Sequence, residues 1–367
     1  KKIDLFLFCG DAYKTAHPTP TQQKLFLQQL FRLYEAKIPA VIIVGNHDNP
    51  LSLGKAHALD VFSDLPIEGF HIFAKPENKV IETKSGPVQV TGIPWPARHT
   101  LLAKGHGRDK NSAEIAKQIG ERVGDIISML ASELDNNVPA ILAAHLTVSS
   151  GVFSGSERTA VLGSDPVLLP SQLAIKPFDY VALGHLHRHQ NLNKGGAPVV
   201  YSGSVDRVDF GERSDIKGYC DIVIDQSKSA GARASYDFVK LQCREMRHIE
   251  VSLNTKTTQT EQIINEIRKA KVDDTIVKIV YHLPEGATDN VSLHGIQQEC
   301  SAATIASVIP VHHRPVRELR TTFDVKTDPS DMLKHYLEAQ KITGSKLEQL
   351  LEKSSGLMAE LDEAATS

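Results

Sequence analysis

The sequence predicts an α/β fold for about the first 225 residues, followed by a small α+β unit and a helical tail. Short apolar strands alternate with helical stretches in the first part, which is the pattern of an α/β domain. The chain has 367 residues, more than one ordinary hydrophobic core organises, so we expect two or three domains. Four of the predicted strands end in side chains that can bind metal ions. This arrangement indicates an enzyme.

The elements of the first part are predicted from periodicity and from turn residues. The apolar face of a helix over residues 21–37 carries Leu25, Phe26, Leu30, Leu33 and Tyr34. A second helix is predicted over 112–134 on the same grounds. Strands are predicted near 198–202, 219–224 and 236–241. We interpret the small, polar segment 225–234 as a hairpin tip, because a strand pattern follows it.

Three domains follow from these patterns: residues 1–245, residues 246–328 and residues 329–367. The middle part alternates strands and helices, with strands predicted at 247–253, 275–281 and 304–309 and helices at 260–271 and 291–300. The last part is helical in pattern, and Gly344 divides it in two. Its leucine stripes lie beyond the α+β unit, which favours a partner-binding role over packing on its own domain.

Metal-competent side chains follow four predicted buried strands. Asp11 comes after the first strand, and the run Asn46-His47-Asp48 comes after the second. His145 ends a third apolar segment, and His185 and His187 follow a fourth. Residues i and i+2 of an extended segment point the same way, so these two imidazoles can reach one site.

The ligand types indicate which metal would bind. Thiolates are absent from the set, which excludes a structural zinc site of the cysteine type. Carboxylate, amide oxygen and imidazole together suit manganese or iron, and five ligands are too many for one ion. Asp11 could bridge two ions about 3.5–4 Å apart that bind a phosphate and activate water. His47 would then face the substrate, where it could take a catalytic role by stabilising the pentacoordinate phosphorane or by protonating the leaving oxygen. Asp48 could either hold the tautomer of that imidazole or cap the loop.

These motifs resemble those of the calcineurin-like metallophosphoesterases. Gly10-Asp11, the run from Gly45 to Asp48, His145 and the run from Gly184 to His187 occur in the family's order. The Gly92-Ile93-Pro94-Trp95 strand end and the segment from Tyr201 to Glu212 narrow the resemblance to the SbcD-type bacterial nucleases. The added small domain and the helical tail point the same way.

The resemblance implies a four-layer sandwich of two β-sheets flanked by helices, with a capping domain that helps to hold DNA. It also implies two divalent ions, with Mn²⁺ expected, and a DNA exonuclease and endonuclease that acts on double-strand ends and hairpins. Asn46, His145 and His185 would bind one ion, His187 the other, and Asp11 would bridge them. Candidate DNA-binding residues are Lys14, His17, Arg98 and Arg207.

The resemblance further implies partners. The helical tail would bind a coiled-coil ATPase of the SbcC type, and the protein would form a homodimer. We expect the helix over 21–37 to make the dimer contact, because its apolar side is wide for a singly buried helix.

Composition sets the remaining bounds. A net charge of −3 argues against a strongly basic surface over the whole protein. It is compatible with a local basic patch that binds phosphates. No apolar run approaches the roughly 20 residues that span a bilayer. The four cysteines are scattered without a CxxC pair, which favours reduced thiols in a cytoplasmic protein.

Two departures from the family pattern keep other functions open. The Asp-x-His motif with which the family opens is absent, and we expect that sequence preceding Lys1 is missing. Lys14 stands where many relatives have Asp or His. One alternative is another metallophosphoesterase, such as a protein phosphatase or a small phosphodiesterase. The other is a non-catalytic DNA-end clamp or scaffold without a filled metal pair.

Overall fold

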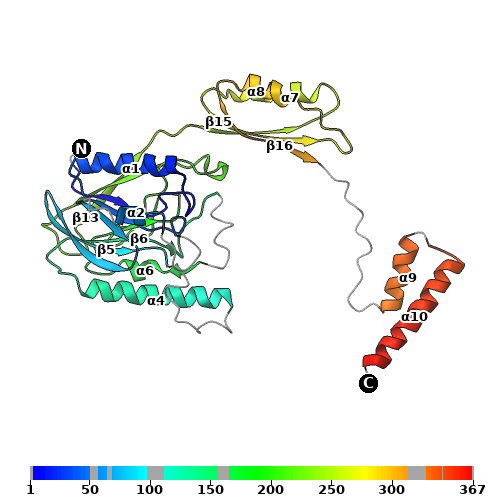
Figure 1. The fold of residues 1–367 in the computed structure, drawn as a ribbon, viewed down its shortest axis with the longest axis horizontal. Helices are drawn as coiled ribbons and strands as arrows, with labels where there is room; N and C mark the ends of the chain where they lie inside the picture. The colour runs from blue at the N-terminus through cyan, green and yellow to red at the C-terminus, as the bar shows by residue number, and fades with distance from the viewer. Residues whose placement is uncertain are drawn as a thin grey trace. The chain divides into compact units, whose positions relative to one another are not determined.

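The structure is a computed structural model that forms two compact units (Figure 1). It describes residues 3–49, 57–63, 68–96, 111–155, 165–312, 328–340 and 342–365. The first unit comprises Lys1–Arg247 with Asp274–Ile276, and the second comprises His248–Asp273 with Val277–Ser367. Within the described residues, no helix combines the length and apolar character that crossing a membrane requires.

The smaller sheet of the first unit has three parallel strands. They are β1 (Phe6–Phe8), β2 (Ala40–Ile43) and β3 (Phe70–Phe73), in that order. Helix α1 (Pro20–Glu35) and the short α2 (Asp60–Ser63) pack against one face of this sheet. Helix α1 begins at a capping box made by Thr19 and Gln22 and confirms the helix predicted over 21–37.

The apolar residues of α1 divide into an inner and an outer set. Leu30 is only 2 % exposed and packs with Ile42 of β2 in the core beneath the helix. Leu25, Phe31 and Tyr34 are 56 %, 47 % and 48 % exposed. The wide apolar side predicted for this helix is therefore partly core and partly surface.

The larger sheet has six strands in the order β10-β11-β9-β6-β5-β4. Their bounds are β4 (Glu77–Thr83), β5 (Gly86–Ile93), β6 (Ala140–His145), β9 (Tyr180–Gly184), β10 (Gln190–Asn191) and β11 (Val199–Tyr201). The four central strands are parallel, and the edge strands β4 and β10 are antiparallel to their neighbours. Helices α4 (Ser112–Ser132) and α6 (Pro170–Leu173) share a core with this sheet.

The two sheets pack face to face. Val41 and Ile43 of β2 and Phe73 of β3 share one core with Ile81 and Val90 of the larger sheet. Figure 1 shows α1 and α4 on opposite sides of the pair of sheets. The layers are thus helix, sheet, sheet and helix, and the predicted α/β sandwich is confirmed.

Smaller elements complete the first unit. Strands β7 (Thr147–Val148) and β8 (Val167–Leu168) pair in parallel, and the 3₁₀ turn η1 spans Phe210–Glu212. Strands β12 (Gly218–Ile224) and β13 (Ala234–Lys240) form an antiparallel pair. The predicted hairpin tip over 225–234 is therefore confirmed.

The second unit contains a three-stranded sheet, two helices that pack on it, and two further helices. The sheet order is β14 (Met246–Ser252), β15 (Ile276–Leu283) and β16 (Thr304–His312). Helices α7 (Gln259–Ala270) and α8 (Leu293–Glu299) bury Ile263 and Ile296 against it. Helices α9 (Pro329–Ala339) and α10 (Ser345–Ala365) pack on each other, and the break at Gly344 lies where predicted.

We expect Gly92→Ala to destabilise the first unit. A Cβ at Gly92 would overlap the ring of Phe73, which is fully buried in the core between the sheets. Overpacking of this kind typically costs about 1–3 kcal/mol, which denaturant unfolding would register as a lower midpoint. Gly195→Ala is the matched control, because nothing lies within 4 Å of a Cβ built there. Equal midpoints for the two variants would contradict the close packing of the sheets.

Candidate metal centre

The carboxyl ends of four strands meet at one edge of the two sheets. Asp11 follows β1, Asn46 follows β2, His145 ends β6 and His185 follows β9. In the parallel register of β6 and β9, His145 stands opposite Gly184. The structure therefore brings together four of the predicted ligands, two from each sheet.

Glycine allows the chains to approach closely at this edge. A Cβ at Gly184 would overlap the carbonyl group of Cys9, and a Cβ at Gly45 would overlap Asp11. Both clashes involve main-chain atoms, which cannot move aside without shifting a strand. The sequence motifs thus combine a ligand with the glycine that makes room for it.

His145 is fully buried and is held from both sides of its ring. Its Nδ1 lies 2.7 Å from the carbonyl oxygen of Cys9. A carbonyl only accepts hydrogen bonds, so Nδ1 carries the proton in this contact. Nε2 then faces the side-chain oxygen of Asn46 at 2.9 Å and Oδ2 of Asp11 at 3.3 Å.

This arrangement fits a cation. With Nδ1 protonated, a neutral His145 points the Nε2 lone pair at two oxygens that are themselves acceptors. Three converging acceptors are unfavourable unless a proton or a metal ion lies among them. Carboxylate, amide oxygen and imidazole are also a donor set that Mn²⁺ and Fe²⁺ accept. The residues present therefore fit the divalent ion that the sequence predicts.

His185 extends the group. Its Nδ1 lies 3.1 Å from the side-chain oxygen of Asn46, and its Nε2 lies 3.6 Å from Oδ2 of Asp165. The ring of Trp95 lies against it, with ring centroids 4.8 Å apart. Potential ligand atoms of Asp11, His145 and His185 all lie within 4.8 Å of one another, so these three residues could hold one ion.

Two of these residues have strained main-chain conformations. Asp11 has a φ of 58° and His185 a φ of 100°, values that non-glycine residues adopt rarely. Such strain costs on the order of 1–3 kcal/mol and clusters at functional sites, where the surrounding structure imposes it. Both side chains are thereby directed toward the shared edge.

Ionisation in the site follows from burial and from the neighbouring charges. Burial alone would raise the pKa of Asp11, but His145 and the main-chain hydrogen bond from His47 lower it to about 2. Burial opposes protonation of His145, yet the carboxylate of Asp11 outweighs this and raises the pKa of His145. At His185 burial dominates, and its pKa is lowered. A low pKa keeps that imidazole neutral, which is the form that binds metal.

Asp48 is fully buried and holds the two loops that carry the ligands. Its Oδ2 accepts the main-chain N–H groups of Asp11 at 2.9 Å and Gly45 at 3.0 Å, and its Oδ1 accepts that of Tyr13 at 3.1 Å. These are the contacts of a loop-capping carboxylate, one of the two roles that the sequence left open. A role for Asp48 in orienting the ring of His47 stays a prediction.

His47 is exposed beside the ligand group. Its main-chain N–H donates to Oδ1 of Asp11 at 2.9 Å. The residue is thus fixed through its main chain, while its ring lies on the exposed side of the site.

His187 stands apart from the ligand group. Within the described residues, the set of closely spaced ligand atoms comprises Asp11, His145 and His185 and does not include His187. Its Nδ1 lies 2.7 Å from Oε1 of Glu212, a buried carboxylate. Burial raises the pKa of Glu212, but hydrogen bonds from His187 and Lys217 outweigh it and lower the pKa below its usual value.

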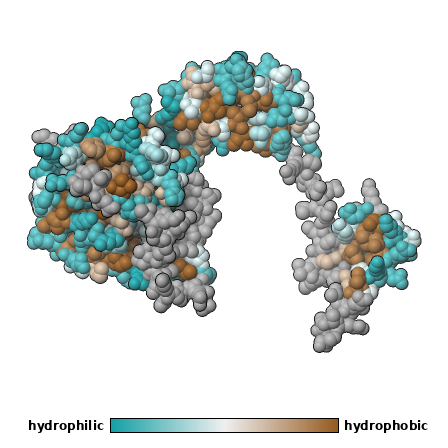
Figure 2. Space-filling view, in the orientation of Figure 1, coloured by the Kyte–Doolittle hydropathy of each residue, from teal (hydrophilic) through white to brown (hydrophobic). Residues whose placement is uncertain are grey.

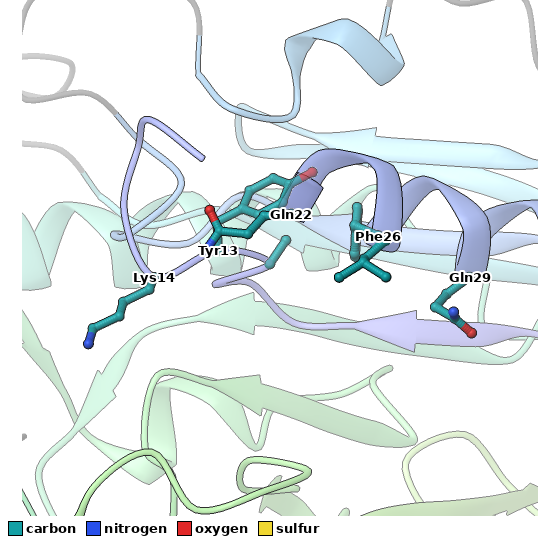
Figure 3. A pocket seen from close by; sticks show the side chains of 7 residues that line it. Tyr13, Lys14, Gln22, Phe26 and Gln29 are labelled. Carbon is teal, nitrogen blue, oxygen red and sulfur yellow. The ribbon is translucent and has the colours of Figure 1, made fainter. Parts of the chain in front are cut away.

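The predicted DNA-binding residues have different surroundings. Lys14 and His17 are exposed on the loop between β1 and α1. Lys14 lines an open hollow of about 350 Å³ together with Tyr13, Gln22 and Gln29, and its amine reaches away from the helix (Figure 3). A cation and two amides there provide polar groups that suit a phosphate or a base.

Arg207 and Arg98 complete the predicted set. The guanidinium of Arg207 donates to the main-chain carbonyls of Arg244 at 2.9 Å and Asp215 at 3.3 Å. These bonds join two loops of the first unit. They give the guanidinium of Arg207 a structural role that does not require DNA. Arg98 lies outside the described residues.

Four residues of the site were not singled out from the sequence for these roles: Trp95, Asp165, Glu212 and Lys217. Trp95 and Glu212 belonged to the motifs on which the family resemblance rests, so the sequence could have indicated that they lie near the site. Asp165 and Lys217 had none, because an acidic or basic residue in a loop is usually solvated.

A comparison with protein families decides the classification. A family model described as calcineurin-like phosphoesterase matches residues 1–189. The chain belongs to this family. The match ends just past His187, so it covers every predicted ligand.

Two curated relatives carry the name of the SbcD component of the nuclease SbcCD. The protein of Staphylococcus epidermidis is 28 % identical over 220 residues, which are 59 % of this chain and 54 % of that protein. The protein of Bacillus subtilis is 28 % identical over 257 residues, which are 66 % of this chain and 60 % of that protein. The matched region thus spans between half and two thirds of each relative. The resemblance to SbcD-type nucleases is confirmed at this level of similarity.

We expect the affinity of the ligand group for Mn²⁺ to rise with pH. The metal must displace a proton from His145, whose pKa Asp11 raises, whereas Asp11 itself stays ionised down to about pH 2. Below the pKa of His145, each fall of one pH unit should therefore weaken Mn²⁺ binding about tenfold. Calorimetry with Mn²⁺ at several pH values measures this slope, and His335→Ala, on exposed α9, is the control. A pH-independent affinity would show that His145 is not a ligand.

Proposed function

We propose that this protein is a two-metal phosphodiesterase that cleaves DNA, as the nuclease component of an SbcCD-type end-processing and repair complex. The observation that carries the proposal is the convergence of Asp11, Asn46, His145 and His185 at one sheet edge, with His47 exposed beside them. The names of the relatives supply the substrate class. A site built for a divalent ion beside an exposed histidine suits phosphodiester hydrolysis.

Each residue of the site has a role in this proposal. Asn46, His145 and His185 would hold the first ion, and His187 would contribute to the second. Asp11 would supply its carboxylate to both; its Oδ2 lies 3.3 Å from Nε2 of His145, and its Oδ1 accepts the main-chain N–H of His47. Divalent ions bound there would supply positive charge that stabilises the transition state and would promote attack by water.

His47 acts on the substrate. In the hydrolysis, a water oxygen bonds to phosphorus and gives up a proton to solvent, and the bond from phosphorus to the leaving oxygen breaks. The leaving oxygen takes a proton, and His47 is the exposed group beside the site that can donate it. Because the Asp11 carboxylate fixes the main chain of His47, a change of its side chain should leave the ligand geometry in place.

Partner binding is a further part of the proposal. Figure 2 shows apolar side chains gathered on the α9–α10 pair, where Tyr336, Leu350 and Leu357 are 42 %, 37 % and 55 % exposed. An amphipathic helical pair of this kind suits docking on a coiled-coil ATPase of the SbcC type. Residues 246–328 would act as the capping domain. The exposed apolar residues of α1 suit a homodimer contact.

One observation keeps a second function open. The ligand group accounts for one ion, and His187 is outside it in the described residues. A protein that holds one ion and binds DNA without cleaving it would be an end clamp or scaffold. Cleavage of DNA by the wild type separates the two functions.

We expect His47→Ala to slow Mn²⁺-dependent cleavage of an end-labelled DNA duplex by about 10²-fold or more, because a general acid contributes on that order. Binding of Mn²⁺ should be unchanged, since the ring of His47 lies outside the ligand group. His335→Ala, which changes an exposed histidine of α9, should cleave like the wild type. DNA binding without cleavage by the wild type would favour the clamp.

We expect Lys14→Ala to weaken DNA binding about equally for all sequences. A lysine that contacts one phosphate releases about one counterion, so the slope of log affinity against log salt should fall by about 0.9. Lys194→Ala, in the exposed turn before β11, is the matched control. Fluorescence anisotropy at several salt concentrations measures both slopes. An unchanged slope for Lys14→Ala would remove this residue from the DNA-binding surface.

A further inference from the structure

A buried ion pair lies next to His187. The side chains of Glu212 and Lys217 are both 0 % exposed, and Oε2 of Glu212 lies 2.7 Å from Nζ of Lys217. Removing two charges from water costs several kcal/mol for each ion, so a buried pair of this kind contributes little net stability. Its presence calls for a role other than stability.

The pair holds His187 at two points. Oε1 of Glu212 lies 2.7 Å from Nδ1 of the imidazole, and Nζ of Lys217 donates to the main-chain carbonyl of His187 at 2.9 Å. The main-chain N–H of Val208 completes the shell of Glu212 by donating to Oε2 at 3.1 Å. Both the ring and the main chain of His187 are therefore fixed by residues more than 20 positions away in the sequence.

The contacts also determine which ring nitrogen carries the proton. An ionised carboxylate accepts hydrogen bonds and does not donate them, so the proton of His187 is on Nδ1. Nε2 is then the nitrogen with the lone pair, through which a neutral imidazole binds metal. Metal-binding histidines are typically oriented by such a carboxylate on the other nitrogen.

We propose that Glu212 and Lys217 are positioning residues that hold His187 in the orientation and tautomer in which Nε2 can bind the second divalent ion. This inference rests on the proposed two-ion function. Lys217 contacts both partners. Its Nζ lies 2.7 Å from Oε2 of Glu212, and its bond to the carbonyl of His187 fixes the main chain. Neither residue touches the substrate.

The test is the number and affinity of Mn²⁺ ions bound, measured by calorimetry and by the electron paramagnetic resonance signal of free Mn²⁺. Loss of an orienting partner typically weakens metal binding 10–100-fold. We therefore expect Glu212→Gln to weaken the second Mn²⁺ by that factor and to leave the first unchanged. Cleavage should recover when Mn²⁺ is raised to saturation.

A second variant covers the case in which Glu212→Gln fails to fold. Glu212→Leu combined with Lys217→Met replaces the buried pair by apolar side chains of similar size, an exchange that proteins often tolerate. It removes both contacts to His187 and should lose the second Mn²⁺ in the same way. Second-ion affinity like that of the wild type in either folded variant would overturn the proposal.

Asp179→Asn is the matched control. Asp179 pairs with Arg233 at 3.4 Å, and both are buried in the same unit. Asp179 precedes β9, so it lies at the strand end opposite the metal centre. This variant should lower the unfolding midpoint without changing either Mn²⁺ affinity, which separates a general loss of stability from a loss of positioning.

His187→Ala separates a failure of the positioning role from a failure of the two-ion function. If it loses the second ion while Glu212→Gln keeps it, the two-ion function stands and the positioning role is wrong. If His187→Ala binds both ions like the wild type, His187 is not a ligand and the positioning proposal fails. A wild type that binds only one ion would instead overturn the two-ion function.

Discussion

The hydrogen bond between Nδ1 of His145 and the carbonyl of Cys9 is the contact on which the rest of the site depends. It joins the end of β6 in the larger sheet to the end of β1 in the smaller sheet at 2.7 Å. It also determines that Nε2 faces Asn46 and Asp11. A single contact therefore sets both the spacing of the two sheets at this edge and the ligand atom of a buried histidine.

That spacing imposes a second constraint: residues where two strand ends approach closely must lack a side chain. Gly184 and Gly45 sit where a Cβ would overlap the main chain of a neighbouring strand end. Asp48 then satisfies the main-chain N–H groups that such tight loops would leave unpaired. The loops of the candidate metal centre are therefore held by buried hydrogen bonds and close packing.

The two halves of the proposed metal site are built in different ways. The first half uses side chains that the strand ends deliver directly, and their close approach creates the need for a cation. The second half depends on His187, which Glu212 and Lys217 fix through a buried network. Separate construction would allow the two ions to differ in affinity, since each half has its own orienting contacts.

The sequence by itself determined the sandwich, most of its helices and strands, and the meeting of Asp11, Asn46, His145 and His185. The sandwich follows from the resemblance to the metallophosphoesterases. The elements and their shared edge follow from local periodicity and from the rule that parallel strands place their carboxyl ends at one edge. Only the tertiary structure decided the loop-capping contacts of Asp48, the burial of Leu30 and the Glu212–Lys217 pair on His187. The physical reason is that these roles are set by contacts between residues far apart in the sequence, which no local pattern encodes.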